Sequence, residues 1–260
     1  LAFALNVVGL MNVQFAVKDE DVYLLEVNPR GSRTVPFVAK ATGNPVAKIA
    51  ARIMSGEKLS SMSLITAKQE HVAVKEAVFP FARFPGVDVF LGPEMKSTGE
   101  VMGIDKEFGI AFAKSQLGAG VDLPISGTVF ISIKDADKPA FVEICHSLIE
   151  SGLEICATDG TTKYLNKAGI PARRVNKVLE GRPHAVDAML SGEIDLVFNT
   201  AHGVAAIQDS LSLRQTALTN NIPYYTTMSG SRAAVAAIRA LQKTKLSAKS
   251  IQDYLHSVSS

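Results

Sequence analysis

The sequence predicts an α/β protein whose second half is a doubly wound parallel sheet. From about Val121 onward, short apolar runs alternate with segments of helical periodicity, which is typical of strands covered by helices on both faces of a sheet. The chain has 260 residues, enough for one large or two smaller domains, and 47% of them are hydrophobic, enough to fill a core. The change of pattern predicts two domains, over residues 1–120 and 121–260.

The first predicted element is a β-hairpin. Val13, Phe15 and Val17 alternate with polar or small residues, as in a strand with one buried face. Residues 18–21 form a charged turn, and residues 22–27 form the return strand.

Two short helices are predicted after the hairpin. The first covers residues 36–41 and is ended by Gly43. Asn44 and Pro45 are a cap and first-position pair typical of a helix start, and Gly56 ends that second helix.

The next segment, residues 77–103, is rich in Pro and Gly. It predicts irregular structure with brief strands. A free linker is disfavoured because the apolar rings in this region need burial, and they belong to Phe79, Phe81, Phe84 and Phe90.

Five strands and five helices are predicted in the second domain. Alternation of the two element types favours a parallel sheet, because a strand followed by a helix returns to the same edge of the sheet. The predicted strands cover 127–133, 153–157, 173–176, 196–198 and 222–225, and the predicted helices cover 138–151, 160–168, 183–191, 204–218 and 231–242.

The composition excludes several classes of protein. The formal net charge is +2, so no broad basic field points to a nucleic acid or an anionic membrane as a partner. No apolar run reaches the roughly 20 residues that a membrane span needs. Cys145 and Cys156 lack metal-ligand spacing, which predicts two buried, reduced thiols.

The hairpin carries a candidate metal site. Glu26 and Asn28 lie two apart in a strand and share a face, and a register that pairs Gln14 with Glu26 would add Gln14 and give a three-residue loop. One carboxylate and two amides are oxygen ligands suited to Mg²⁺. Arg30 and Arg33 follow and are suited to phosphoryl oxygens. The alternative is an exposed sheet face beside a basic loop.

The second domain carries a candidate anion site at the start of a helix. The run from Ala157 to Thr161 follows a strand and opens a helix, where backbone N–H groups and the helix dipole favour an anion. Thr158 and Thr161 add hydroxyl donors, and Gly160 lets an anion approach the backbone closely. An ordinary helix N-cap is the alternative.

A second strand end opens on the same edge of the predicted sheet. Residues 199–203 end one strand and start a helix, and ligands of open α/β sheets gather at the carboxyl edge. Lys177, after the third strand, can reach that edge, although single lysines are usually solvated surface charges. Together these residues predict a pocket for a phosphorylated small molecule.

The first half resembles the end of an ATP-grasp domain, in particular the second such domain of carbamoyl-phosphate synthase large subunits. The likeness covers nearly the whole chain. The strings that carry it run from Gly9 to Val17, Leu24 to Arg30, Arg33 to Phe37, Ala39 to Gly43, Phe84 to Asp88 and Leu91 to Gly103.

This resemblance implies roles for the hairpin residues. Gln14, Glu26 and Asn28 would hold the divalent metals, Mg²⁺ or Mn²⁺, that bridge the ATP phosphates. Arg30 and Arg33 would be catalytic, beside the transferred phosphoryl group and carbamate. The family makes carbamoyl phosphate from bicarbonate, glutamine-derived ammonia and ATP, and positioning and charge neutralisation carry most such phosphoryl transfers.

The chain begins at Leu1, without Met or a signal peptide and inside an apolar run. We interpret this start as a cut through a longer polypeptide, which makes the chain a C-terminal fragment of such a large subunit. The part that clasps adenine would then lie before Leu1, so the fragment alone is expected to be inactive. The resemblance also implies a glutaminase small subunit as partner, a homo-oligomer of the full enzyme, a cytoplasmic location, and a place in pyrimidine and arginine biosynthesis.

The second half resembles the methylglyoxal-synthase-like domain, of Rossmann-like fold, that regulates carbamoyl-phosphate synthases. The match is carried by residues 158–161, 175–184 and 199–200. In bacterial members the implied effector is uridine or inosine monophosphate. By position, the effector would be held by Lys138, Thr158, Asp159, Gly160, Thr161, Lys177, Asn199 and Thr200.

Two residues depart from the family pattern. Ala201 stands where some members have a second threonine, which removes one hydroxyl contact. Tyr225 stands where an aspartate helps to bind ornithine in enteric-type enzymes, although Glu76 and Thr226 match. The resemblance therefore leaves both the effector and activation by ornithine open.

Other functions are possible for this sequence. His184 and His202 invite a catalytic interpretation, but structural or ligand-contact roles are favoured. A methylglyoxal synthase acting on dihydroxyacetone phosphate would resemble its family in a Gly-Gly-Asp string, and residues 182–187 stand there instead. A purely structural role in oligomerisation is the third hypothesis.

Overall fold

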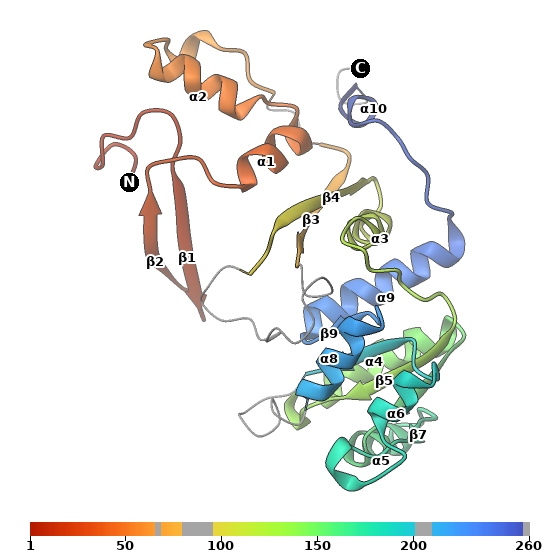
Figure 1. The fold of residues 1–260 in the computed structure, drawn as a ribbon. Coiled ribbons are helices and arrows are strands. Elements are labelled where there is room, and N and C mark those ends of the chain that lie inside the picture. The colour runs from red at the N-terminus through yellow and green to blue at the C-terminus, as the bar shows by residue number, and fades with distance from the viewer. Residues whose placement is uncertain (66–68, 80–95, 201–209, 257–260) are drawn as a thin grey trace. The chain divides into compact units, whose positions relative to one another are not determined.

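The computed structural model describes residues 1–65, 69–79, 96–200 and 210–256. The chain divides into two compact units (Figure 1), unit 1 being Leu1–His71 with Ala248–Ser260 and unit 2 being Val72–Ser247. The domain division between residues 120 and 121 rests on the sequence pattern and stays a prediction. The predicted burial of Phe81, Phe84 and Phe90 and the first part of the helix predicted at 204–218 lie outside the described residues.

Unit 1 contains the predicted hairpin, formed by β1 (Asn12–Lys18) and β2 (Asp21–Asn28). Gln14 pairs with Glu26, which confirms the predicted register at that point. The predicted three-residue loop is wrong, because Lys18 pairs with Asp21 and a β-bulge after Gln14 takes up the extra residue. Asp19 in the turn has a φ of 56°, a left-handed conformation that a short polar side chain tolerates.

The two predicted helices of unit 1 are present. α1 (Thr34–Thr42) ends at Gly43, whose φ of 77° lets its N–H bond to the carbonyl of Ala39. α2 (Val46–Met54) follows Pro45, and the predicted capping role of Asn44 is wrong. The amide of Asn44 instead exchanges hydrogen bonds of 3.0 and 2.8 Å with the backbone of Ile65, because an amide offers a donor and an acceptor together.

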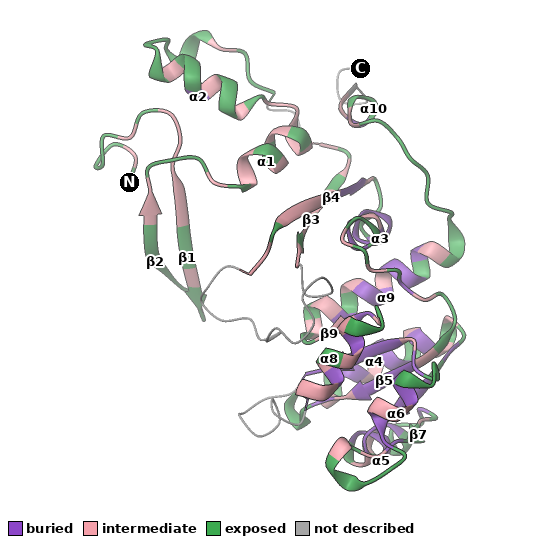
Figure 2. Cartoon of the chain, viewed as in Figure 1, coloured by how far each residue is buried: buried purple, intermediate pink, exposed green. Residues whose placement is uncertain are grey.

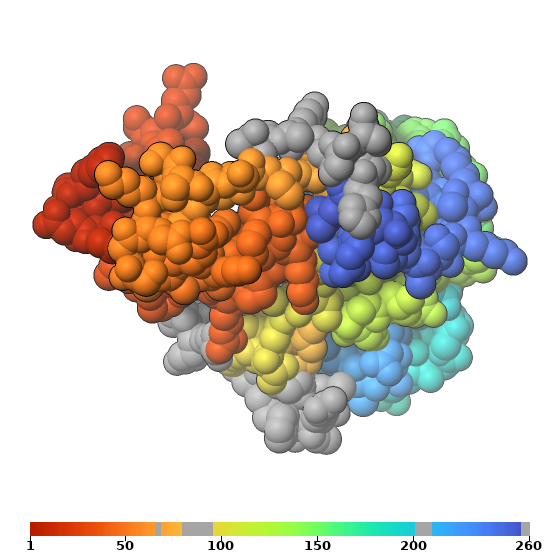
Figure 3. All heavy atoms as spheres, turned by 90° about the horizontal axis from the view of Figure 1, so that it is seen from above, coloured from red at the N-terminus to blue at the C-terminus, as the bar shows by residue number. Residues whose placement is uncertain are grey.

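Unit 1 buries little of its apolar surface. A 3₁₀ turn lies at Leu59–Ser61. Near the end of the chain, helix α10 (Ile251–His256) lies beside α1, as Figure 3 shows. Among the described residues of unit 1, only Ala50 and Tyr254 are buried apolar side chains. Figure 2 shows the hairpin of unit 1 in the colours of exposed and intermediate residues. Phe15 is 55% exposed and Val17 70%, so the face of the hairpin that the alternation predicts to be buried is exposed at these two residues.

Unit 2 begins with an antiparallel pair and a helix. β3 (Val72–Val78) pairs with β4 (Gly99–Asp105), and α3 (Phe108–Gly118) packs on both strands and on α9 (Met228–Lys243). Two glycines allow these close approaches. A Cβ on Gly103 would lie 1.9 Å from the carbonyl oxygen of Ala111 in α3, and one on Gly109 would lie 2.6 Å from that of Ala236 in α9.

The rest of unit 2 is the predicted parallel sheet, with strand order β7-β6-β5-β8-β9. All five predicted strands are present and parallel. They are β5 (Gly127–Ser132), β6 (Leu153–Ala157), β7 (Arg173–Arg174), β8 (Leu196–Asn199) and β9 (Tyr224–Tyr225).

Helices cover both faces of this sheet, which confirms the doubly wound fold. Alternate strand residues enter different clusters: Val129 and Ile131 pack with α3, α4 (Lys138–Glu150), α5 (Asp159–Lys167) and α9, whereas Phe130 packs with α6 (Ala185–Leu190) and α8 (Leu211–Thr219). Short 3₁₀ turns lie at Asp135–Asp137 and Val178–Glu180. Among the described helices, none combines the length and apolar character needed to cross a bilayer.

The two cysteines are free and buried, as predicted. Burial raises the pKa of both the Cys145 and the Cys156 thiol to about 12, so neither forms the reactive thiolate near neutral pH. We expect Ellman's reagent to label no thiol in the native chain at pH 8 and both thiols in guanidinium chloride. Rapid labelling of the native chain would contradict this packing.

Candidate functional site

The hairpin of unit 1 brings the predicted metal-binding side chains onto one face. Gln14 lies opposite Glu26, and Asn28 Nδ2 donates a 2.9 Å hydrogen bond to Glu26 Oε1. Glu26 and Gln14 are exposed, and Asn28 is half-buried. The remaining oxygens of this group are the hard ligands that Mg²⁺ or Mn²⁺ prefers, so the donor set fits such an ion.

The two predicted catalytic arginines follow the hairpin. Arg30 Nη1 donates to the carbonyl of Gly31 at 3.1 Å, and Arg33 occupies the N-cap position of α1 without a side-chain capping bond. Both side chains are exposed. Their catalytic role stays a prediction.

In unit 2 the ends of β5, β6 and β8 meet at the carboxyl edge of the sheet, where hydrogen bonds connect them. The backbone N–H of Ile133, just after the central strand β5, donates to Thr161 Oγ1 at 3.3 Å, and that of Lys134 donates to Thr200 Oγ1 at 3.2 Å. Thr158 Oγ1 donates to Thr161 Oγ1 at 3.3 Å. The structure therefore gathers the hydroxyls of Thr158, Thr161 and Thr200 around the loop that leaves β5.

Thr161 and Thr200 are placed to donate to a ligand, whereas Thr158 donates its hydroxyl proton to Thr161. Thr158 is the N-cap residue of α5, but its side chain makes no capping bond to the helix backbone. Backbone N–H groups already occupy the acceptor side of Thr161 and Thr200, so their hydroxyl protons can point to an anion. All three side chains are at most 5% exposed, so an anion that reaches them loses most of its water.

Lys138 adds a positive charge beside these threonines. From the first turn of α4 its ammonium reaches α5, where it donates to the carbonyl of Gly160 at 3.2 Å. It also lies 2.6 Å from Asp135 Oδ1, and this hydrogen bond lowers the pKa of that carboxyl. Within the described part of the chain these contacts use two of the three ammonium donors, which leaves one for a phosphate oxygen.

Asp159, also predicted to bind the effector, has cationic partners of its own. Its carboxylate accepts from Lys163 Nζ at 2.7 Å and lies 3.5 Å from Arg174 Nε. The hydrogen bond from Lys163 lowers the pKa of Asp159, with smaller help from the charge of Arg174. Asp159 is therefore an anion at neutral pH, which would repel a phosphate, and its role in binding stays a prediction.

The other two predicted ligand residues have different surroundings. Lys177 is exposed three residues after β7, and its backbone N–H donates to the carboxylate of Glu180 in the turn that follows. Asn199 ends β8 and is 2% exposed, and its amide nitrogen donates to the phenol oxygen of Tyr224 at 2.6 Å. No contact among the described residues joins either side chain to Thr158, so their roles in binding stay predictions. Ala201 and His202 lie outside the described residues.

His184 has a structural role. It is the N-cap of α6, where its Nδ1 accepts the backbone N–H of Asp187 while Asp187 Oδ2 accepts the backbone N–H of His184. The ring is 7% exposed. This arrangement favours the structural interpretation of His184 over a catalytic one.

Tyr225, which departs from the family pattern, belongs to a hydrogen-bond chain. Its hydroxyl donates to Gln116 Oε1 at 2.9 Å, and Gln116 Nε2 donates to Glu76 Oε2 at 2.9 Å. Burial raises the pKa of Tyr225, and the nearby charge of Glu76 raises it further. Where the resemblance implies two carboxylates for a cationic ligand, this chain has one carboxylate bonded to an amide and a neutral phenol.

Glu76 makes the stability of unit 2 depend on pH. Burial raises its pKa, partly offset by the hydrogen bond from Gln116. A carboxyl with a raised folded-state pKa stabilises the fold below its unfolded pKa, and that contribution is lost as the pH rises through the folded pKa. Glu76→Gln, which keeps an acceptor for Gln116, should raise the thermal midpoint at pH 7 by about 1 °C and by less at pH 4.

The control for this prediction is Glu100→Gln on the paired strand. Glu100 lies 3.3 Å from Lys75 Nζ, so removing its charge should leave the midpoint unchanged or lower. Calorimetric scans of both variants at the two pH values check the prediction. An equal or larger gain for Glu76→Gln at pH 4 would contradict it.

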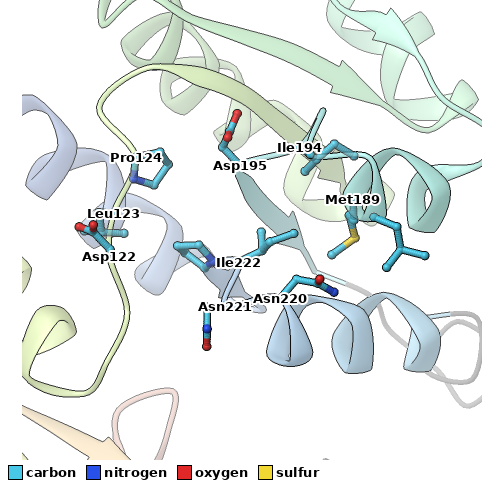
Figure 4. A pocket seen from close by; sticks show the side chains of 12 residues that line it. Asp122, Leu123, Pro124, Met189, Ile194, Asp195, Asn220, Asn221 and Ile222 are labelled. Carbon is cyan, nitrogen blue, oxygen red and sulfur yellow. The ribbon is translucent and has the colours of Figure 1, made fainter. Parts of the chain in front are cut away.

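A separate cavity lies at the opposite, amino edge of the sheet. It has a volume of about 460 Å³ and is lined by residues that precede β5, β8 and β9, among them Asp122, Asp195 and Asn220 (Figure 4). Asp195 Oδ2 accepts the backbone N–H of Thr128 at 2.8 Å. None of the predicted phosphate-binding residues lines this cavity.

Sequence reasoning missed several groups of the carboxyl-edge site. The N–H groups of Ile133 and Lys134 matter because β5 is the central strand, and strand order is not visible in local sequence. Tyr224 was missed because its partner Asn199 is 25 residues away. These N–H groups follow the end of the first predicted strand, at Ser132 and Ile133. Because parallel strands end at one edge of the sheet, that strand end could have been added to the predicted site.

Two family models match this chain. Residues 1–62 match the ATP binding domain of the carbamoyl-phosphate synthase L chain, and residues 140–226 match the MGS-like domain.

Curated relatives match along almost the whole chain. The carbamoyl phosphate synthase large chain of Rhizobium meliloti (strain 1021) is 56% identical over 98% of this chain and 22% of its own length. That of Brucella suis biovar 1 (strain 1330) is 54% identical over 99% of this chain and 23% of its own, and that of Archaeoglobus fulgidus is 52% identical over 98% and 24%. The chain thus spans under a quarter of the length of these relatives.

Among solved structures similar to part of the chain is a methylglyoxal synthase. The crystal structure of methylglyoxal synthase from Elizabethkingia anophelis NUHP1 covers 44% of this chain and 80% of its own, at 18% identity and a TM-score of 0.37. At that score the likeness supports no further conclusion.

Proposed function

Because the chain belongs to the carbamoyl phosphate synthase large-chain family, we propose that it joins part of an ATP-dependent active site to a domain that binds a nucleotide effector. The observation that carries the effector part is the carboxyl edge of the sheet. There Thr161 and Thr200 accept backbone bonds from the loop after β5, and Lys138 places its ammonium beside Gly160. Hydroxyls, a helix start and one cation are the groups that hold a phosphate monoester.

The effector in this proposal is uridine or inosine monophosphate. Its phosphate would bind Thr158, Thr161 and Lys138, and its ribose would meet Asn199 and Thr200. Binding of this kind regulates an enzyme only if the nucleotide favours one of two conformations of the whole protein. With a phenol at Tyr225, we expect ornithine to lack one of its two carboxylate partners.

The hairpin of unit 1 would serve the phosphorylation of carbamate. Gln14, Glu26 and Asn28 would hold Mg²⁺ or Mn²⁺, which when bound neutralises the ATP phosphates. Arg30 and Arg33 would orient and neutralise phosphoryl oxygens with their planar donors. Since the chain spans 22% of the length of a relative, we propose that these residues contribute to the synthesis and do not carry it out alone.

The remaining proposals concern the parent protein. Family membership supports a glutaminase small subunit as partner, a homo-oligomeric full enzyme, a cytoplasmic location and a role in pyrimidine and arginine biosynthesis.

Calorimetric titration of the 260-residue chain with uridine and inosine monophosphates tests the effector proposal. We expect saturable heat with at least one of them, and competition by inorganic phosphate. No heat at millimolar nucleotide from a chain with native circular dichroism would refute it.

A further inference from the structure

Two adjacent tyrosines place their hydroxyls on opposite faces of the sheet. β9 consists of Tyr224 and Tyr225, and neighbouring strand residues leave a sheet by opposite faces. Tyr225 packs in the cluster beneath α4 and α9, and Tyr224 packs in the cluster beneath α6 and α8. The phenol of Tyr225 bonds to Gln116, whereas that of Tyr224 contacts Asn199, a predicted effector-binding residue.

Asn199 presents the nitrogen end of its amide to Tyr224, since Nδ2 donates to the phenol oxygen. Arg214 and Ser210 also hydrogen-bond the phenol, and the guanidinium carbon of Arg214 lies 5.8 Å from its ring centroid. A guanidinium can only donate, so the phenol oxygen is an acceptor for Arg214 as it is for Asn199 Nδ2, which donates to it at 2.6 Å. This hydrogen bond holds Asn199 Nδ2 on the phenol, so Oδ1 is the end of the amide that is left for a ligand.

The orientation of Asn199 limits what it can bind. An amide oxygen only accepts, and a phosphate near pH 7 presents mainly acceptor oxygens, so the two would repel. A ribose hydroxyl, in contrast, can donate to Oδ1, and both candidate effectors carry a ribose. Thr200, the next residue, has its hydroxyl in the threonine group at the sheet edge, so Asn199 lies one residue from the predicted phosphate site.

We propose that Tyr224 is a positioning residue for the nucleotide effector, which holds Asn199 so that its Oδ1 accepts a hydrogen bond from a ribose hydroxyl. Thr158, Thr161 and Lys138 then hold the phosphate alone. The proposal rests on the proposed function and adds to it the residue that orients Asn199 for the ribose.

Tyr224→Phe tests this positioning role, with Tyr225→Phe as its matched control. Each change removes one buried hydroxyl from the same strand, and thermal unfolding of both variants shows whether they are folded. In calorimetric titrations of the 260-residue chain, Tyr224→Phe should weaken uridine and inosine monophosphate by the same factor, roughly 3–10-fold. It should leave inorganic phosphate unchanged, and Tyr225→Phe should change none of the three.

The outcomes separate this inference from the function on which it rests. No nucleotide binding by the unaltered chain would overturn the proposed function and this inference together. Nucleotide binding that is the same in Tyr224→Phe overturns the inference alone, and so do an equal loss of phosphate binding, unequal losses for the two nucleotides, or an equal loss in Tyr225→Phe.

Discussion

Replacing Gly103 by alanine is expected to destabilise unit 2 by about 3 kcal/mol or more, because the new methyl group meets the backbone of α3. An added Cβ would lie 1.9 Å from the carbonyl oxygen of Ala111 and 2.5 Å from the nitrogen of Ser115. Backbone atoms cannot move aside as a flexible side chain can. Calorimetric scans of the 260-residue chain should show the thermal midpoint lowered by about 6 °C or more.

Gly99→Ala is the matched control, since Gly99 begins the same strand and an added Cβ there meets nothing within 4 Å. Its midpoint should stay within about 1 °C of that of the unaltered chain. Equal midpoints for the two variants would show that β4 does not pack on α3 as described. That result would also contradict the packing of β3, β4 and α3 into one core with the parallel sheet.

Replacing Lys138 by methionine is expected to weaken nucleotide monophosphate binding by about 10-fold or more. A hydrogen bond between charged groups is worth about 1.5–3 kcal/mol, and methionine removes the ammonium while keeping an unbranched apolar stem. The side chain of Lys138 is 14% exposed, so its charge is screened less than that of a surface lysine. Titration calorimetry with uridine and inosine monophosphates measures the loss.

Lys167→Met controls for the change in net charge. Lys167 lies in the last turn of α5, the end of the helix away from Thr158, and it is exposed. Its replacement should alter affinity by less than about 2-fold. If both variants lose the same affinity, the loss comes from the lower net charge of the chain. Lys138 then has no specific contact with the phosphate.

Much of the fold was predictable because its signals are local. The five strands of the sheet are short apolar runs bounded by helical periodicity, and Gly43 ends α1 where a residue with positive φ is needed. The pairing of Gln14 with Glu26 is the register that the predicted three-residue metal site requires. The loop was not predictable, because a two-residue turn with a bulge uses the same number of residues as a three-residue loop.

Helix α3 shows what local sequence cannot predict. Its residues from Gly109 to Ala113 are all buried, since strands lie on one side of it and α9 lies on another. A helix surrounded in this way has no polar face and therefore no amphipathic pattern to detect. Its packing also depends on β3 and β4, whose pairing joins segments separated by about 20 residues of chain.

The candidate site likewise has a part that local sequence predicts and a part that depends on the order of the strands. Thr158 and Thr161 could be predicted because they sit where a strand meets a helix, a junction that one stretch of sequence reveals. The bonds from Ile133 and Lys134 required the order of strands in the sheet. The orientation of the Asn199 amide required Tyr224, which comes from another strand.

The central claim is that the carboxyl edge of the sheet binds the phosphate of a nucleotide effector. A crystal structure of the chain grown with uridine or inosine monophosphate tests it most directly. We expect electron density for the phosphate within hydrogen-bonding distance of the hydroxyls of Thr158 and Thr161 and of the Lys138 ammonium. Nucleotide density in the cavity beside Asp122 and Asn220, with none at the threonines, would contradict the claim.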